Sequence, residues 1–340
     1  PDGVPVADAF SGGCIRLSTA DAKLLFQKVK KDIPVLVYSN DRINIPEYAY
    51  FKKFIPEHDA ETPLFSARAI LVADFETGNI LYEYNKNAPY PIASITKLMT
   101  AHVAVETINR FKILTITQSI LNKEGNLGNL YVCESFKSEE FLYPLLLTSS
   151  NDVAELYKNE VWKFVDIMNQ KARAIGMTDT VYKDASGLSQ ENVSTTADLF
   201  RLLQFIRENK EPIFTLSGLK EYKATSRDTK HIAHVWKNIN WPEDDGRFIG
   251  GKSGTTPEAG QAMAGVYKIK FSEYGERPIA IIVLRSEDRI KDIHAIIAYL
   301  EKQFVYGTTL TQHQVPQATT TAVRIRQGAN LYEAINVFLR

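Results

Sequence analysis

The stretch PIASITKLMTA, at residues 91–101, places Ser94 three positions before Lys97. A serine hydroxyl is a poor nucleophile unless a nearby base removes its proton, and an ordinary lysine amine is protonated and cannot be that base. Residues three apart on a helix share a face, so these two side chains can touch. Burial and a second positive charge both lower the pKa of a lysine. The pair therefore predicts an activated serine wherever the fold buries Lys97 beside another cation.

The same spacing occurs again in SGLK at residues 217–220. A serine three places before a lysine arises by chance about once or twice in a chain of ordinary composition. The spacing alone does not identify the nucleophile, and the surrounding sequence has to decide between the two pairs.

Two further motifs carry polar groups that could take part in proton transfer and substrate binding. TSSNDVAEL contains Ser149 and Asn151, a hydroxyl and an amide that can relay a proton and hold a substrate amide, and GGKSGTT supplies Lys252 as the second cation. Each motif alone is usually a turn, a helix cap or a loop. Together, SITK, SSN and KSG occur in the order of the S-x-x-K, S-D-N and K-T-G set of β-lactamases and penicillin-binding proteins.

The pattern of strands and helices around these motifs predicts an α+β unit. ARAILVADFETGNILYEYN predicts two strands joined by a turn at residues 77–79, and helices are predicted over 94–107, 152–174 and 194–207. Strands return in RFIGGKSGT, QAMAGVYKIKF and RPIAIIVLRS, and RIKDIHAIIAYLEKQF closes the unit as a helix. Strands at both ends of a helical middle favour α+β over alternating βαβ.

Residues 64 to about 305 resemble the low-molecular-mass penicillin-binding D-alanyl-D-alanine carboxypeptidases, serine peptidases of family S11. The likeness includes YPIASITKLMTA, GMTDTVYKDASGLSQENVSTTADLFRL and GKSGTTPEAGQAMAG. It implies the DD-peptidase/β-lactamase-like fold, an antiparallel sheet flanked by helices with a helical subdomain. SITK follows a strand pair and opens an apolar helix, as the family's serine does, whereas SGLK lies outside that frame.

The resemblance implies hydrolysis of the terminal D-Ala–D-Ala bond of peptidoglycan stem pentapeptides. Ser94 would attack the carbonyl of the penultimate D-alanine and form an acyl-enzyme, with Lys97 as its base. Ser149 would assist proton transfer towards the leaving D-alanine. Backbone N–H groups of Ser94 and Thr255 would form the oxyanion hole. β-Lactam antibiotics are expected inhibitors, and no cofactor and no metal are predicted.

The resemblance also implies a substrate-binding set. Asn151 would hold the peptide amide, and Lys252 would help to bind the terminal carboxylate through nearby hydroxyls. Ser253 supplies one of these hydroxyls where threonine is usual in the family. Arg285 matches a position where family members often place a carboxylate-binding arginine; its alternative is a solvated charge at a strand end. The whole set is Asn151, Lys252, Ser253, Gly254, Thr255 and Arg285.

Cys14 belongs to a different pattern. FSGGCIRLSTADAKLLFQKVKKDIPVLVY resembles the C-terminal part of an L,D-transpeptidase catalytic domain, whose signature Ser-x-Gly-Cys-x-Arg is here Ser11, Gly13, Cys14 and Arg16. A thiolate nucleophile needs a base or a positive partner. All six histidines follow Cys14, and Gly12 occupies the nearer histidine position of that family. We therefore expect an incomplete L,D-transpeptidase segment of a longer natural protein; the alternative is a vestigial segment whose cysteine only packs.

The chain of 340 residues is expected to divide into four segments. These are the L,D-transpeptidase-like fragment (1–40), a linker that packs on another element (41–63), the serine peptidase domain (64–308), and a flexible tail or the start of another element (309–340). With 40 basic and 40 acidic residues and no basic block, nucleic acid is not an expected partner. No apolar run approaches the roughly 20 residues that span a bilayer. No signal peptide is visible, and the family implies an extracytoplasmic location, in the cell envelope or periplasm.

Three alternative functions stay open. The fold could serve a D,D-endopeptidase that cuts cross-links, a β-lactamase, or a non-catalytic cell-wall binding module with a degenerate site. The complete set of three motifs argues against the binding module. The absence of a convincing glutamate for deacylation argues against the β-lactamase.

Overall fold

The computed structural model describes residues 53–56, 61–121, 127–228, 230–243, 246–271 and 275–307. All of them belong to one structural unit, Lys52–Gly307. Cys14, the predicted segment 1–40 and the predicted tail 309–340 lie outside the described residues. Strand β1 (Lys53–Pro56) lies inside the stretch predicted as a linker, and it pairs antiparallel with β13 (Phe304–Gly307).

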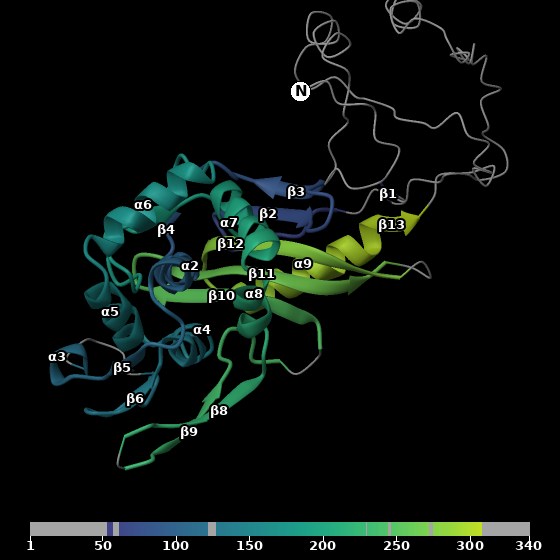
Figure 1. The fold of residues 1–340 in the computed structure, drawn as a ribbon. Coiled ribbons are helices and arrows are strands. Elements are labelled where there is room, and N and C mark those ends of the chain that lie inside the picture. Colours follow the sequence, from purple (N-terminus) through teal and green to yellow (C-terminus); the bar gives the residue numbers. More distant parts are fainter. Residues whose placement is uncertain are drawn as a thin grey trace, which may run out of the picture. The chain divides into compact units, whose positions relative to one another are not determined.

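A five-stranded antiparallel sheet forms one half of this unit (Figure 1). Its strands, in spatial order, are β10 (Phe248–Thr256), β11 (Gly260–Lys270), β12 (Glu276–Ser286), β2 (Ala69–Asp74) and β3 (Ile80–Tyr84). All five were predicted from the sequence, and the predicted turn at 77–79 joins β2 to β3. The α+β fold class is confirmed.

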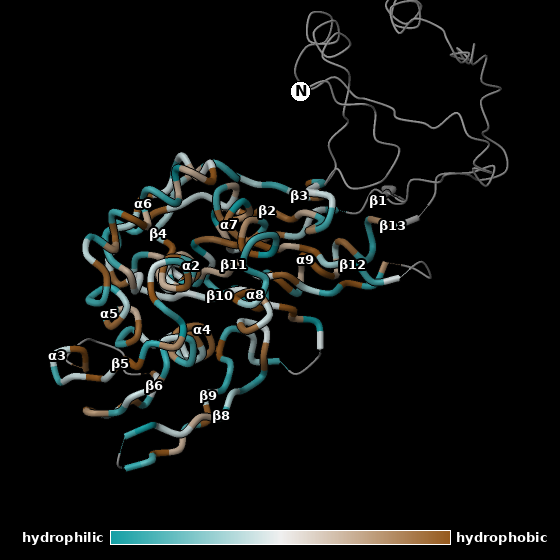
Figure 2. The backbone as a smooth tube through the Cα atoms, viewed as in Figure 1, coloured by the Kyte–Doolittle hydropathy of each residue, from teal (hydrophilic) through white to brown (hydrophobic). Residues whose placement is uncertain are grey.

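Alternate residues of the central strands face two different hydrophobic cores. In β2, Leu71 and Ala73 pack towards the helical half, whereas Ile70 and Val72 pack towards α9 (Arg289–Gln303). Side chains in a strand alternate between the two faces of the sheet, so a strand that is covered on both faces is apolar throughout. Figure 2 shows apolar residues concentrated on β2, β11 and β12.

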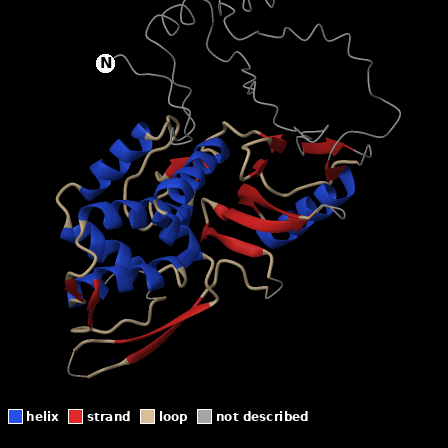
Figure 3. Cartoon of the chain, turned by 45° about the vertical axis from the view of Figure 1, so that its right-hand side comes forward, coloured by secondary structure: helices blue, strands red, loops and turns tan. Residues whose placement is uncertain are grey.

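The other half of the unit is mostly helical, and Figure 3 shows its helices gathered to one side of the sheet. Three two-stranded ribbons accompany them: β4 (Tyr90–Pro91) with β7 (Val193–Ser194), β5 (Ile113–Thr115) with β6 (Ser135–Lys137), and β8 (Glu221–Thr225) with β9 (Ala233–Lys237). The helices are η1 (Ala93–Thr96), α2 (Lys97–Thr107), α3 (Gln118–Leu121), η2 (Ser138–Phe141), α4 (Leu142–Leu146), α5 (Asn151–Glu160), α6 (Phe164–Ala174), α7 (Thr196–Asn209) and α8 (Glu211–Ser217). No helix among the described residues is long and apolar enough to cross a membrane.

The helix predicted over residues 152–174 is in fact two helices. α5 ends at Glu160, because Val161 turns to an extended conformation and packs against the helical core. Lys163 then adopts a left-handed conformation, with φ 55°, directly before α6. The apolar periodicity continues through this break, so the sequence pattern alone did not reveal it.

Candidate active site

Ser94 lies in η1, the short 3₁₀ turn that leads directly into α2. The preceding residue, Ala93, has φ 47°, a left-handed conformation that a non-glycine residue adopts at a cost of about 1–3 kcal/mol. Two glycines lie close to the backbone nitrogen of Ser94. A Cβ atom would lie 2.8 Å from that nitrogen at Gly254 and 2.9 Å from it at Gly187. Only glycine therefore allows β10 and the loop around Gly187 to approach the nucleophile from both sides.

The amine of Lys97 contacts Ser94 as the spacing predicted. Lys97 Nζ lies 2.9 Å from Ser94 Oγ, and it also donates to Asn151 Oδ1 (2.7 Å) and to the carbonyl oxygen of Ser186 (2.6 Å). The side chain is fully buried. Burial lowers the pKa of Lys97 to about 7, although the carboxylate of Asp184 opposes the shift. A large fraction of this amine is neutral at neutral pH and can accept the proton of the serine.

Asp184 fixes the loop that brings the Ser186 carbonyl to Lys97. Its Oδ1 accepts from the backbone N–H groups of Ser186 (2.7 Å) and Gly187, and its Oδ2 accepts from the N–H of Ser189 (2.6 Å). Aspartate commonly stabilises turns by such bonds to the following backbone. The sequence reasoning did not assign this residue, although the run Asp-x-Ser-Gly is a recognisable signal for the turn.

Ser149 and Asn151 lie where α4 leads into α5. Ser149 is buried with φ 62°, Ser150 caps α5 by accepting from the N–H of Val153 (3.3 Å), and Asn151 is the first residue of α5. The predicted amide is therefore close to the nucleophile, and its oxygen contacts Lys97. The strained conformation at Ser149 is of the kind that clusters at active sites.

Lys252 is the second buried cation, and Asn240 holds it in place. Lys252 Nζ donates to Asn240 Oδ1 (2.6 Å) and to the carbonyl oxygen of Ser253 (2.9 Å). The same Asn240 oxygen accepts from the backbone N–H and the hydroxyl of Ser253, both at 3.0 Å. Burial lowers the pKa of Lys252 well below its ordinary value, and the positive charges of Lys97 and Arg289 lower it further. An anion that enters the site would favour the protonated form of this amine.

Thr255 is contacted by Arg289, a residue that the sequence analysis did not single out; the carboxylate-binding role suggested for Arg285 stays a prediction. Arg289 Nη1 donates to Thr255 Oγ1 (2.9 Å), and burial lowers the pKa of the guanidinium. Arg285 is exposed, and its Nη1 donates to the carbonyl oxygens of Pro257 (3.3 Å) and Glu258. The two arginines are four residues apart across the junction of β12 and α9, and the sequence did not show that Arg289 would contact Thr255.

The model of the D-alanyl-D-alanine carboxypeptidase family, peptidase family S11, matches residues 57–284 of the chain. The chain belongs to this family. A D-alanyl-D-alanine endopeptidase of Pseudomonas aeruginosa is 36% identical over 248 residues, which cover 67% of this chain and 75% of the relative. The D-alanyl-D-alanine carboxypeptidase DacC of Escherichia coli is 25% identical, over 70% of this chain and 61% of the relative.

Solved structures show the same fold. A D-alanyl-D-alanine carboxypeptidase of Mycobacterium tuberculosis superposes with a TM-score of 0.63 at 22% identity, and the match covers 74% of this chain and 98% of that chain. A Streptomyces DD-transpeptidase superposes with a TM-score of 0.63 at 23% identity, covering 71% of this chain and 99% of that chain.

In this member of the D-alanyl-D-alanine carboxypeptidase family, the serine of the second serine–lysine pair, Ser217, has a structural role. Ser217, at the end of α8, is fully buried; its hydroxyl donates to the carbonyl of Phe214 (2.7 Å) and accepts from the N–H of Gly251 (2.9 Å). It thereby joins α8 to β10. Lys220 is exposed beyond the helix. Burial and contacts, rather than spacing, separate the two pairs.

Proposed function

We propose that this protein is a serine D-Ala-D-Ala carboxypeptidase that acts on peptidoglycan stem pentapeptides through an acyl-enzyme at Ser94. The observation that carries the proposal is the contact of 2.9 Å between Ser94 Oγ and the amine of Lys97, whose pKa burial lowers to about 7. A general base is most effective when its pKa lies near the working pH.

The arrangement of these groups supports the following reaction. Ser94 Oγ bonds to the carbonyl carbon of the penultimate D-alanine while its proton passes to Lys97 Nζ. The oxyanion lies towards the backbone N–H groups of Ser94 and Thr255, where hydrogen bonds stabilise developing charge. Cleavage of the C–N bond releases D-alanine, whose amine takes the proton held by Lys97 Nζ, with Ser149 assisting the transfer. Water then hydrolyses the ester and regenerates the hydroxyl of Ser94.

The terminal carboxylate of the substrate would bind among cationic and hydroxyl groups. Ser253 and Thr255 are alternate residues of β10, so their hydroxyls lie on one face of the strand. Lys252 contributes positive charge beside them, and Arg289 reaches Thr255 from the start of α9. We assign to Arg289 the role that the sequence suggested for Arg285.

Two measurements test this function. After treatment with penicillin, peptide mass mapping should place the covalent adduct on the peptide that contains Ser94. Incubation with a stem pentapeptide should release free D-alanine. An adduct on Ser217, or acylation that persists in the Lys97→Ala variant, would refute the assignment.

A second candidate is a D,D-endopeptidase that cleaves cross-linked stem peptides. It is supported by the relatives from Pseudomonas aeruginosa and from Escherichia coli (27% identical over 66% of this chain and 73% of the relative), both named D-alanyl-D-alanine endopeptidase. The relative rates of D-alanine release from a pentapeptide and of cleavage of a cross-linked dimer distinguish the two activities. Either activity would place the protein at the peptidoglycan, outside the cytoplasm.

Cys14 is proposed to be inactive as an L,D-transpeptidase nucleophile in this chain. The support is the sequence alone, in which Gly12 occupies the nearer histidine position of the family that this segment resembles. A thiolate nucleophile needs a base or a positive partner to lower the pKa of the thiol, and the glycine removes one such partner. Stoichiometric labelling of Cys14 by a carbapenem, with turnover of a tetrapeptide donor, would overturn this proposal.

A further inference from the structure

The loop of residues 184–189, between α6 and β7, contacts the proposed general base through a backbone carbonyl. Among the described residues, Lys97 Nζ lies within hydrogen-bond distance of three oxygen atoms: Ser94 Oγ (2.9 Å), Asn151 Oδ1 (2.7 Å) and the carbonyl oxygen of Ser186 (2.6 Å). They come from η1, from α5 and from this loop. The three oxygens differ in whether they can donate a hydrogen bond, and this difference determines how the amine is oriented.

A neutral lysine amine has two N–H groups and one lone pair, so one of its three neighbours faces the lone pair. The side-chain oxygen of Asn151 and the carbonyl oxygen of Ser186 only accept hydrogen bonds, whereas the hydroxyl of Ser94 can also donate. The two N–H groups therefore bind Asn151 and Ser186, and the lone pair is directed at the Ser94 hydroxyl. If the Ser186 carbonyl moved away, the amine could rotate about its Cε–Nζ bond and present an N–H to the serine instead.

The side chain of Asp184 gives the loop its shape. Besides the bonds to the backbone described above, its Oδ1 accepts a hydrogen bond from the hydroxyl of Ser186 (3.0 Å), and its Oδ2 accepts from the N–H of Ser189 (2.6 Å). One carboxylate thus collects the donors of a turn whose direction is set by these bonds. The position of the Ser186 carbonyl therefore depends on Asp184.

Buried polar side chains fasten the same loop to η1 and α2. Thr100 Oγ1 donates to the carbonyl oxygen of Ala185 (2.6 Å), and Asn192 Nδ2 donates to Thr96 Oγ1 (3.1 Å). Asn192 Oδ1 also accepts from the backbone N–H of Asp184 (3.1 Å). The backbone around the Asp184 turn is thereby held close to the helix that carries the base, and the turn sets where the carbonyl between these anchors points.

The carboxylate of Asp184 also acts on Lys97 through its charge. Among the described residues, the charged groups that face Lys97 are Asp184 from the loop and Lys252 from β10, while α5 presents the neutral amide of Asn151. Arg289 of α9 acts on Lys252. A negative charge favours the protonated amine and so raises the pKa of Lys97, against the effect of burial. Removing this charge lowers that pKa further.

We propose that Asp184 is a positioning residue of the reaction: its carboxylate holds residues 184–189 against α2, so that the carbonyl of Ser186 keeps the lone pair of Lys97 directed at the hydroxyl of Ser94. The same carboxylate keeps the amine basic enough to take the proton of the serine. Asp184 itself does not touch the reacting atoms and acts through Ser186 and Lys97. This proposal rests on the proposed function, because it concerns the proton acceptor of the same reaction.

Two substitutions in the full chain test these roles by the rate of penicillin acylation from about pH 5.5 to 9. Asp184→Ala removes every bond that shapes the turn, so we expect the highest rate to fall by about 10- to 100-fold. Asp184→Asn keeps one oxygen for the N–H groups of Ser186 and Gly187 but removes the charge. It should lose less rate, and the pH of half-maximal acylation should fall by about half a unit or more.

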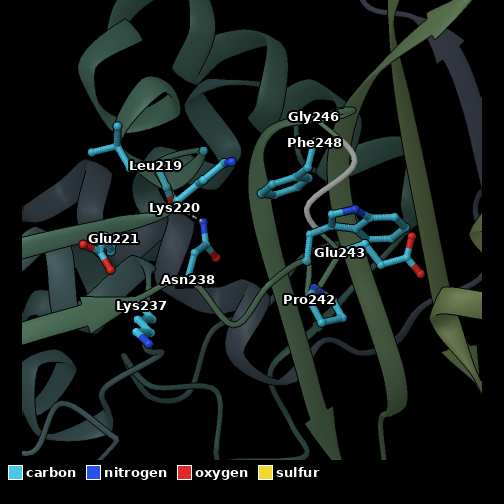
Figure 4. Close-up of a pocket in the computed structure, with 11 residues that line it drawn as sticks. Leu219, Lys220, Glu221, Lys237, Asn238, Pro242, Glu243, Gly246 and Phe248 are labelled. Atoms are coloured by element: carbon cyan, nitrogen blue, oxygen red, sulfur yellow. Dashed lines mark hydrogen bonds between the residues drawn. The ribbon is translucent and has the colours of Figure 1, made fainter.

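Glu221, on β8, provides a control for the loss of a carboxylate elsewhere. It is exposed and lines a separate cavity of about 300 Å³ between the end of α8, the β8–β9 ribbon and the loop before β10 (Figure 4). Glu221→Gln removes one negative charge, as Asp184→Asn does, and should change neither the acylation rate nor its pH dependence. The stoichiometry of acylation gives the folded fraction of each variant, and the pH of half-maximal rate does not depend on that fraction.

A slower Asp184→Asn variant with an unchanged pH of half-maximal acylation would overturn the proposal, because Asp184 would then support only the fold of the loop. Acylation of Asp184→Ala at the rate of the unmodified protein would also overturn it, since the base would not need this turn. Both results would leave the proposed function intact. If penicillin does not acylate Ser94 in the unmodified protein, the proposed function and the role of Asp184 both fall.

Discussion

Asn240 and Lys252 lie twelve residues apart in the chain, and the side-chain oxygen of Asn240 accepts a hydrogen bond of 2.6 Å from the Lys252 amine. Asn240 Nδ2 donates in turn to the carbonyl of Leu146 (2.8 Å), in the segment that leads to Ser149. One buried amide therefore ties the two halves of the site together, the helical half through Leu146 and the sheet through Lys252.

Replacing Asn240 by alanine should loosen both halves of the site. We expect penicillin acylation to slow by tenfold or more and the free energy of unfolding to fall by about 1–3 kcal/mol, because buried donors lose their acceptor. Stopped-flow acylation and urea unfolding measure the two effects. Asn240→Asp is the informative comparison, since a carboxylate there would raise the pKa of Lys252. Unchanged acylation in Asn240→Ala would show that Lys252 needs no such support.

The acylation rate should rise with pH and reach half of its maximum near pH 7. Lys97 acts as a base only when it is neutral, and burial lowers its pKa to about 7. The rate of penicillin acylation between pH 5.5 and 9 gives the profile. A rate that stays flat across this range would mean that another group takes the proton of Ser94.

Asp152 should make the protein less stable as the pH rises. Its carboxyl group is buried in the first turn of α5, neither oxygen has a hydrogen-bond partner among the residues that the structure describes, and burial raises its pKa to about 6. A folded-state pKa above the unfolded value favours folding below about pH 4, and this contribution is lost as the pH rises through 6. Asp152→Asn should therefore be more stable than the unmodified protein at pH 8, by on the order of 1–3 kcal/mol, and gain little at pH 4. Urea unfolding at both pH values decides the matter; an equal difference at pH 4 and pH 8 would exclude titration as its cause.

Arg289→Gln should slow hydrolysis of a peptide with a free terminal carboxylate by about 10- to 100-fold, because a charged hydrogen bond contributes about 1.5–3 kcal/mol. The same peptide with an amidated terminus is the control, and the variant should hardly change its already low rate. If the variant slows both peptides equally, Arg289 supports the fold of the site and does not bind the carboxylate.

Ser217→Ala should destabilise the protein by about 1 kcal/mol, since its hydroxyl links Phe214 to Gly251. Penicillin should still form its adduct on Ser94. Thermal unfolding and mass mapping of the variant test the two statements, and loss of the adduct in a folded variant would contradict the structural role of Ser217.

The sequence by itself determined the features that depend on short spacing and on alternation. Ser94 and Lys97 meet because residues three apart share a helical face. β2 and β12 were recognisable because strands covered on both faces are continuously apolar. The three motifs, in their order and with their flanks, also distinguished SITK from SGLK.

Only the tertiary structure decided the protonation state of Lys97 and the contacts of the other polar side chains of the site. Lys97 bonds to groups 54 and 89 residues away, and its lowered pKa comes from burial by segments that no local pattern connects. Asn240 carries no motif that marks it as the partner of Lys252. The contact between Arg289 and Thr255 joins residues 34 apart, and the bulge of β12 beside Arg285 was likewise not visible in the sequence.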